Sequence, residues 1–303
     1  MSKIIAVIPH YNTCMWTQTS TYCLINAAKE SIHDVEIVVI DNASDSGRRS
    51  FKSNTINSIA TKDFSNITVL KNDRPIKFQG TALDMVVQYY DADYLLCWES
   101  DIAIFDNNPI DWIVDYLNNN TWMAGYEVKD YRESINTVSW YVMPNPGIYR
   151  MDILKDINNE VINNTDPTFY FGQNYSQSKV MDLEYTFGVF SERRGFNSYS
   201  NKCNDCTSEL VRTIPGWYEN GQWLFYKMMR DSQMEYKVLP SNRVIISYNG
   251  ESAPAYSEFG NNLFKHYWAG TRSWDFLTHA EVNCSQINYI KEKIELEIDL
   301  WKQ

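Results

Sequence analysis

Four short apolar runs in the first third of the chain constrain the fold more than any other feature. They cover residues 4–8, 35–40, 67–70 and 94–98, and the first three are rich in Val and Ile. Consecutive apolar residues over this length are typical of strands buried on both faces of a parallel sheet. Residues 21–31 and 81–90, between these runs, have apolar residues at three- and four-residue spacing, as helices do. The alternation predicts a doubly wound α/β fold, whose ligands bind beyond the carboxyl ends of the strands.

Charge and hydropathy exclude several classes of partner. The net charge is −11, from 27 basic and 38 acidic residues, which argues against nucleic acid. No run approaches the roughly 18 apolar residues of a membrane span, and the chain leads directly into the first strand, so we expect a soluble, cytoplasmic protein. The six cysteines show no disulfide framework and are expected to be reduced. Cys203 and Cys206 lack the second pair or nearby His that a zinc site needs.

The ends of the first two strands carry residues suited to binding a nucleoside. The first strand leads into Pro9-His10-Tyr11-Asn12, and the second into Asp41-Asn42. An aromatic ring and a carboxylate at adjacent strand ends can stack on a base and accept hydrogen bonds from it or from ribose. Ordinary turn chemistry would also explain them. The glycine patterns of dinucleotide enzymes and of P-loop enzymes are absent, so a nucleotide would be held differently.

The fourth strand is followed by two carboxylates separated by one residue, Glu99 and Asp101. Side chains two apart on a strand face the same side, and carboxylates are suitable ligands for Mg²⁺ or Mn²⁺. A cation there could bridge two phosphate oxygens of a nucleoside diphosphate. The pair by itself is explained as simply by an acidic loop. It gains weight from its place after the two earlier strand ends and after Gln79-Gly80, which opens the preceding helix.

In this order, the motifs resemble the N-terminal half of the family 2 glycosyltransferases, which have the A-type fold. The resemblance covers residues 3–105 and continues more weakly to about residue 200. It implies a Rossmann-like, mostly parallel sheet with helices on both faces. Residues 1–280 would form the catalytic domain, with a nucleotide-binding half at 1–105 and an acceptor-binding half at 106–280. In that second half, aromatic and Asn-rich sequence interrupted by prolines predicts loops and short helices.

The resemblance also implies roles for individual residues. Tyr11 would stack on the base, Asp41 would bind the base or ribose, and Asp101 would coordinate the metal. Glu99 stands where the family usually has Asp, which keeps the charge on a longer arm, and Asp84 stands where Asn is common. The residues expected to bind the nucleotide are Pro9, Tyr11, Asp41, Arg74, Lys77 and Gly80, with either Arg74 or Lys77 approaching the diphosphate.

A second element lies far downstream, in the segment from Phe264 to Trp274. Its order of His, aromatic, Gly, cation and Trp is similar to the C-terminal element of several A-type glycosyltransferases. There the His completes the metal shell and the cation contacts the diphosphate. His266 and Arg272 are the matching residues in this chain. Imidazole beside carboxylates suits Mn²⁺, and a planar guanidinium suits a diphosphate leaving group.

The general base is the residue that the sequence specifies least. Inverting members of the family take the acceptor proton with a carboxylate from an acidic motif before a helix, and Met181-Asp182-Leu183-Glu184 resembles that motif. We favour Asp182, with Glu184 and Glu219 as alternatives, because general-base catalysis requires only a carboxylate within reach of the hydroxyl. Inversion follows from the resemblance to family 2, although the C-terminal His element also occurs in retaining enzymes.

The function expected is transfer of a sugar from a UDP- or GDP-linked donor to a hydroxyl of a glycan or other acceptor, with Mn²⁺ or Mg²⁺ as cofactor. One alternative is a sugar-phosphate nucleotidyltransferase, but Pro9-His10-Tyr11-Asn12 lacks the glycines and cations of its phosphate loop. The other is a non-catalytic carbohydrate-binding protein, which the 10 Trp and 21 Tyr would suit. Residues 281–303 predict an amphipathic helix that docks on the catalytic domain or forms a homodimer contact.

Overall fold

The computed structural model describes residues 1–10, 14–42, 65–72, 79–105, 108–132, 137–163, 224–225, 228–229, 232–248 and 251–267. A seven-stranded sheet with the order β3-β2-β1-β4-β7-β6-β8 forms its centre. The parallel part contains β1 (Lys3–His10), β2 (Asp34–Asp41), β3 (Ile67–Lys71) and β4 (Tyr94–Cys97). The rest contains β6 (Thr121–Arg132), β7 (Thr137–Arg150) and β8 (Glu235–Val238). The four strands expected from the apolar runs are thus confirmed.

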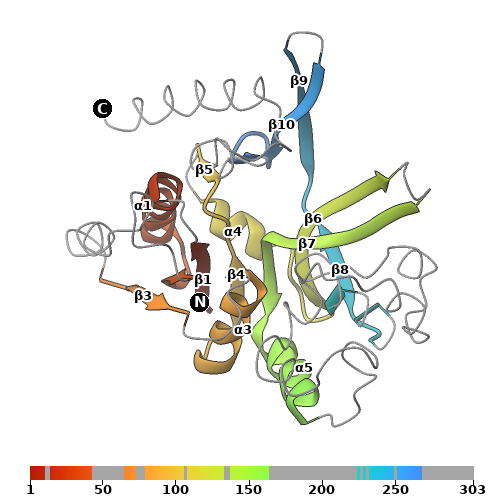
Figure 1. Ribbon diagram of the computed structural model, residues 1–303. Coiled ribbons are helices and arrows are strands. Elements are labelled where there is room, and N and C mark those ends of the chain that lie inside the picture. The colour runs from red at the N-terminus through yellow and green to blue at the C-terminus, as the bar shows by residue number, and fades with distance from the viewer. Residues whose placement is uncertain are drawn as a thin grey trace.

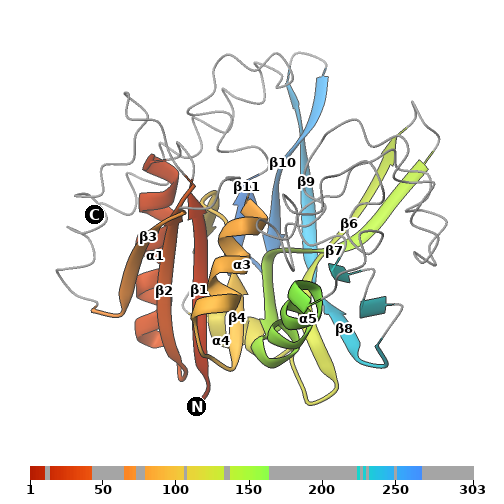
Figure 2. The ribbon, with the colours of Figure 1, turned by 60° about the horizontal axis from the view of Figure 1, so that its bottom comes forward.

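The central parallel strands β1, β2 and β4 are largely buried because helices cover the sheet from both sides, whereas the edge strand β3 is half-buried. Ile4, Ala6 and Ile8 of β1 share a core with α1 (Cys14–Glu30) and α4 (Pro109–Val114). Ile5 and Val7 of the same strand share the other core with α3 (Gln79–Tyr89) and α5 (Met151–Asn163). Figures 1 and 2 show the two pairs of helices on opposite faces. The predicted α/β class, with a mostly parallel sheet, is therefore confirmed.

None of the described helices combines the length and apolar character that crossing a bilayer requires. Cys23 and Cys97 are buried in the core. The helix expected at residues 281–303 and the Cys203-Cys206 pair lie outside the described residues.

The expectation of loops and short helices after residue 105 is wrong for much of the described part, which contains long antiparallel strands. β6 and β7 form a hairpin in which Gly125 pairs with Gly147 and Tyr126 pairs with Met143. Residues 144–146 are therefore the extra residues of a bulge. Pro144 and Pro146 lie in that bulge, where a strand can do without a ladder N–H. The prolines mark an irregularity within a strand, and not a loop.

A second, four-stranded sheet brings the distant C-terminal strands to the end of β4. Its order is β5-β11-β10-β9, formed by β5 (Ile102–Ile104), β9 (Ser241–Tyr248), β10 (Glu251–Phe259) and β11 (Phe264–Tyr267). β11 pairs antiparallel with β5, and β9 and β10 project away from the larger sheet (Figure 1). Phe259 and Phe264 stack with ring centroids 4.6 Å apart and join the core on the α1 side.

The turn between β10 and β11 sets the register of that pairing. Gly260, Asn261 and Asn262 have positive φ angles of 57°, 56° and 75°. The Leu263 N–H donates to the Phe259 carbonyl at 2.9 Å, and the Leu263 carbonyl accepts from the Phe105 N–H at 2.8 Å. The tight turn thereby fixes β11 against both β10 and the residue that follows β5.

Buried polar side chains gather at the carboxyl ends of the parallel strands. His10, at the end of β1, is fully buried, and its Nδ1 lies 2.7 Å from Thr17 Oγ1 on α1. Asn72 Nδ2 donates to Asn42 Oδ1 at 2.7 Å, which links the ends of β3 and β2. Burial lowers the pKa of His10 from 6.5 to about 4, although nearby Asp41 acts in the opposite direction. His10 is thus a neutral, structural imidazole at neutral pH.

We predict that Gly260→Ala lowers the free energy of unfolding by about 1–3 kcal/mol. A methyl group at this position would lie 2.6 Å from Leu263 Cδ1 and 3.0 Å from the Trp112 ring, at a φ of +57° that disfavours side chains. Urea unfolding measures the change. Asn261→Gly, at the exposed neighbour with a similar φ, is the control and should change stability by less than about 1 kcal/mol. Equal stabilities for Gly260→Ala and the parent would contradict the crowding.

His10 should make folding sensitive to acid. Its pKa is lower in the folded chain, so the unfolded chain binds the proton more readily. The stability that the neutral ring contributes is complete above about pH 6.5 and is lost as the pH falls toward 4, by at most about 3 kcal/mol. In His10→Asn, an uncharged amide faces Thr17, and urea unfolding should show a shallower decline between pH 7 and 4.5 than in the parent. Parallel declines would show that His10 does not carry the effect.

Candidate metal centre

Glu99, Asp101 and His266 lie together at the carboxyl end of β4. Glu99 and Asp101 belong to the turn between β4 and β5, and β11 supplies His266. In the antiparallel register of β11 and β5, His266 is opposite Ile102, the residue directly after Asp101. The pairing of two short strands therefore brings together residues that are far apart in the sequence.

The three side chains are in direct contact. His266 Nε2 lies 2.7 Å from Glu99 Oε2 and 3.5 Å from Asp101 Oδ1. One ligand atom from each residue lies within 4.8 Å of those from the other two. The His266 and Asp101 side chains are only 4% and 7% exposed, whereas that of Glu99 is 18% exposed. The cluster is therefore almost dry, with Glu99 nearest to solvent.

The buried charges perturb one another strongly. Burial by itself lowers the pKa of His266, but the carboxylates of Glu99 and Asp101 outweigh burial and raise this pKa to about 10. Burial raises the pKa of Asp101, which the bond to His266 offsets in part. His266 is thus an imidazolium, and it and the two acidic side chains stabilise one another in a nearly dry place.

The donor set fits a divalent cation. Atoms that bind one Mg²⁺ or similar ion at about 2.1 Å stand roughly 3–4 Å from one another, which is close to the spacing of this cluster. Two carboxylates suit Mg²⁺ and Mn²⁺, and the imidazole nitrogen favours Mn²⁺ of the two. A cation would take the place of the proton on His266 Nε2, because an imidazole binds metals in its neutral form.

A hydroxyl on α1 contacts the turn that carries Glu99 and Asp101. Ser20 Oγ accepts a hydrogen bond from Trp98 Nε1 at 3.1 Å and donates one to the Glu99 carbonyl at 3.0 Å. Ser20 and Trp98 are both fully buried. Sequence reasoning missed Ser20, because a serine inside a helix gives no signal of a partner 79 positions away.

The proposed nucleotide end of the site lies beside this cluster. β1 pairs with β2 on one side and with β4 on the other. Asp41, the last residue of β2, and Glu99, shortly after β4, therefore lie at strand ends that flank the end of β1. Asp41 is half-buried and lies directly opposite His10 in the ladder, next to the pair formed by Pro9 and Ile40. Gly80 is buried in the first turn of α3.

Asp84, where the resembling family commonly has Asn, is a fully buried carboxyl group on α3. Burial raises the pKa of the Cys97 thiol, and the charges of Asp84 and Glu99 raise it further. The side chain of Asp84 is therefore close enough to the end of β4 to act on a group there electrostatically.

Several residues expected in the site fall outside the part of the chain that the structure describes. They include the proposed base-stacking residue, both candidate diphosphate contacts of the N-terminal half, the C-terminal cation and all three candidate bases. These residues are Tyr11, Arg74, Lys77, Arg272, Asp182, Glu184 and Glu219.

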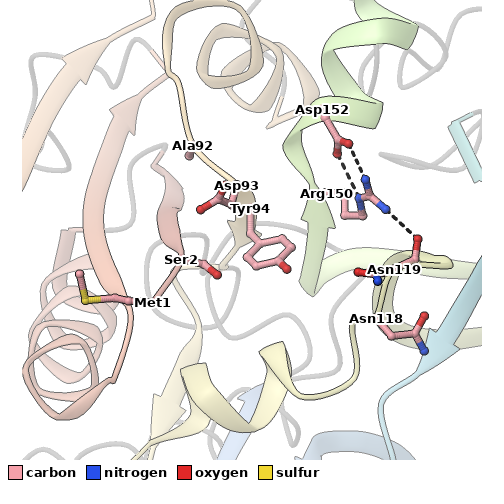
Figure 3. Close-up of a pocket in the computed structure, with 9 residues that line it drawn as sticks. All are labelled: Met1, Ser2, Ala92, Asp93, Tyr94, Asn118, Asn119, Arg150 and Asp152. Carbon is pink, nitrogen blue, oxygen red and sulfur yellow. Dashed lines mark hydrogen bonds and ion pairs between the residues drawn. The ribbon is translucent and has the colours of Figure 1, made fainter.

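A polar cavity of about 510 Å³ lies at the opposite edge of the sheet, where β4 begins and β7 ends (Figure 3). Arg150 donates to both carboxylate oxygens of Asp152, at 3.1 and 2.5 Å, and to the Asn119 carbonyl at 2.9 Å. Asp93 accepts from the Lys3 N–H at 2.8 Å. The polar groups of the cavity thus serve to join β7, α5 and the loop before β6, far from the metal cluster.

The structure resembles solved glycosyltransferase structures at low identity. S. aureus TarS (residues 1–349) in complex with UDP is 15% identical, with a TM-score of 0.37, over 66% of this chain and 55% of that one. The mannosyltransferase PcManGT from Pyrobaculum calidifontis, in complex with GDP-Man and Mn²⁺, is 12% identical, with a TM-score of 0.40, over 77% and 66%. The galactosyltransferase LgtC, in complex with donor and acceptor sugar analogs, is 12% identical, with a TM-score of 0.38, over 72% and 85%.

The match spans about half of the TarS chain. No model of a known protein family matches the sequence, and neither does any curated protein sequence.

Proposed function

We propose that this protein is a metal-dependent glycosyltransferase that uses a nucleoside diphosphate sugar. The observation that carries the proposal is the buried contact of Glu99, Asp101 and His266 at the carboxyl end of β4. In an open α/β sheet this edge is where ligands bind, and the cluster brings two carboxyl groups and an imidazole together there. A divalent cation held by these residues would account for both features.

The nucleoside would lie at the ends of β1 and β2. Asp41, half-buried at the end of β2, would accept hydrogen bonds from the base or ribose, and Tyr11 would stack on the base. The buried Asn42–Asn72 bond stiffens the neighbouring strand ends and so supports the position of Asp41. The diphosphate would then extend past the end of β1 toward Glu99 and Asp101.

Glu99, Asp101 and His266 would hold Mn²⁺ or Mg²⁺. A cation bound there supplies the charge that stabilises a departing diphosphate. Arg272 and one of Arg74 or Lys77 would add positive charge on the same phosphates, where the need is greatest in the transition state. The His266 side chain is only 4% exposed, so its contact with a cation would be shielded from water, which strengthens it.

The acceptor would be a hydroxyl of a glycan or another molecule, bound by residues 106–280. A carboxylate there, for which Asp182 is favoured over Glu184 and Glu219, would remove the proton as the hydroxyl attacks the anomeric carbon. Direct displacement by that hydroxyl inverts the anomeric configuration. The product's configuration, read by NMR, distinguishes this course from retention.

A panel of UDP- and GDP-linked sugars with Mn²⁺ tests the proposal. Release of UDP or GDP supports glycosyl transfer to an acceptor or to water. Release of pyrophosphate from a nucleoside triphosphate and a sugar phosphate would instead identify a nucleotidyltransferase. Sugar binding with no turnover of any donor would identify a carbohydrate-binding protein.

Asp101→Asn should reduce the release of UDP or GDP at least about 100-fold and greatly weaken Mn²⁺ binding, because the amide lacks the negative charge that binds the cation. Calorimetric titration with Mn²⁺, with and without nucleoside diphosphate, measures the binding. Asp115→Asn makes the same chemical change at an exposed position after α4 and should match the parent. Persistent activity of Asp101→Asn in the presence of a chelator would exclude metal dependence.

His266→Gln should raise the Mn²⁺ concentration for half-maximal activity about tenfold or more, because a neutral amide is a poorer ligand than imidazole. At saturating Mn²⁺, the KM for the donor should change much less. Steady-state kinetics across a Mn²⁺ titration separates the two quantities. An unchanged Mn²⁺ requirement would make His266 a packing residue.

A further inference from the structure

The turn that carries Glu99 and Asp101 has little support from the sheets. β4 ends at Cys97 and β5 begins at Ile102, so residues 98–101 lie between two strands. The Trp98 N–H still donates to the Val7 carbonyl at 2.9 Å, as a continuation of the β1–β4 pairing. The position of Glu99 must therefore depend largely on contacts outside the strand ladders.

Ser20 supplies such a contact from α1. Its hydroxyl accepts from the Trp98 indole N–H at 3.1 Å and donates to the Glu99 carbonyl at 3.0 Å. A hydroxyl can donate and accept at once, so one buried atom fixes both a side chain and the main chain of consecutive residues. The Trp98 ring is held on its other side by Phe264 of β11, with ring centroids 5.2 Å apart. Phe264 is two residues before His266 on β11, so Trp98, which directly precedes Glu99, also contacts the strand that carries His266.

We propose that Ser20 is a positioning residue for the metal centre: through its bonds to Trp98 and to the Glu99 carbonyl, it holds the Glu99 carboxylate where a cation can bind it together with Asp101 and His266. This inference rests on the metal binding in the proposed function. The inference goes further because it assigns a positioning role to a residue that would contact neither metal nor substrate. Groups that orient metal ligands commonly contribute about 10- to 100-fold to metal affinity.

The test compares variants of the full chain by the Mn²⁺ dissociation constant, measured by electron paramagnetic resonance of free Mn²⁺. Ser20→Ala removes the donor and the acceptor and should weaken Mn²⁺ binding about tenfold. Ser20→Cys, whose thiol is a weak donor, should give an intermediate loss. Thr21→Val is the matched control, because Thr21 is the next residue of α1 and is also buried. Its hydroxyl has no hydrogen-bond partner among the described residues.

Kinetics gives a readout that a general loss of stability would not move. In Ser20→Ala, the Mn²⁺ concentration for half-maximal activity should rise, while the donor KM at saturating Mn²⁺ stays close to that of the parent. If Ser20→Ala does not fold, Trp98→Phe takes its place, since it removes the indole donor, keeps an aromatic ring and leaves the Ser20 bond to the Glu99 carbonyl in place. Trp98→Phe should weaken Mn²⁺ binding less than the alanine variant, but more than Thr21→Val.

The proposal is overturned if the folded Ser20 variants, or Trp98→Phe in their place, bind Mn²⁺ as tightly as Thr21→Val does. It also fails if the parent binds no Mn²⁺. A parent that binds Mn²⁺ but turns over no nucleotide sugar would refute the proposed function alone. The comparison of Mn²⁺ dissociation constants would then still decide the role of Ser20.

Discussion

The burial of the parallel strands on both faces is the constraint from which the rest of the structure follows. Ile4 to Ile8 of β1, Ile37 to Ile40 of β2 and Leu95 to Cys97 of β4 are completely inaccessible to solvent. Such strands can carry polar side chains only where they end. His10, Asp41, Asn42, Asn72 and Glu99 all lie at these ends, on one edge of the sheet. Because the core excludes polar side chains from the middle of these strands, a polar site can form only at the strand ends.

The pairing of β11 with β5 adds an imidazole to the carboxylates that follow β4. It places an imidazole 2.7 Å from a carboxylate that is far away in the sequence. Burying these charges is costly, and the cost is offset because the imidazolium and the carboxylates stabilise one another. At the opposite end of the strands, Arg150 and Asp152 also form an ion pair, and the Arg150–Asn119 contact joins the end of β7 to the loop before β6.

α1 connects the two parts of the proposed donor site. The helix follows residues 11–13, which contain the proposed base-stacking Tyr11, and its Ser20 donates a hydrogen bond to the Glu99 carbonyl in the turn after β4. Thr17, from the same helix, contacts His10 at the end of β1. One rigid element thus contacts the ends of two strands. In such an arrangement, the ends of β1 and β4 keep a fixed relation, as a ligand spanning nucleoside and diphosphate sites requires.

The sequence by itself determined the parallel strands, the helices between them and the Glu99-Asp101 pair at a strand end, because periodicity and strand ends are local properties. Residue 266 could be linked to that pair only by resemblance to a known element. Four other features depend on the tertiary structure: the second sheet, the proline bulge of β7, the Asn42–Asn72 bond and the contact of Ser20 with the turn that carries Glu99 and Asp101. Each depends on which distant segments pack together, and packing of that kind leaves no periodic trace in the chain.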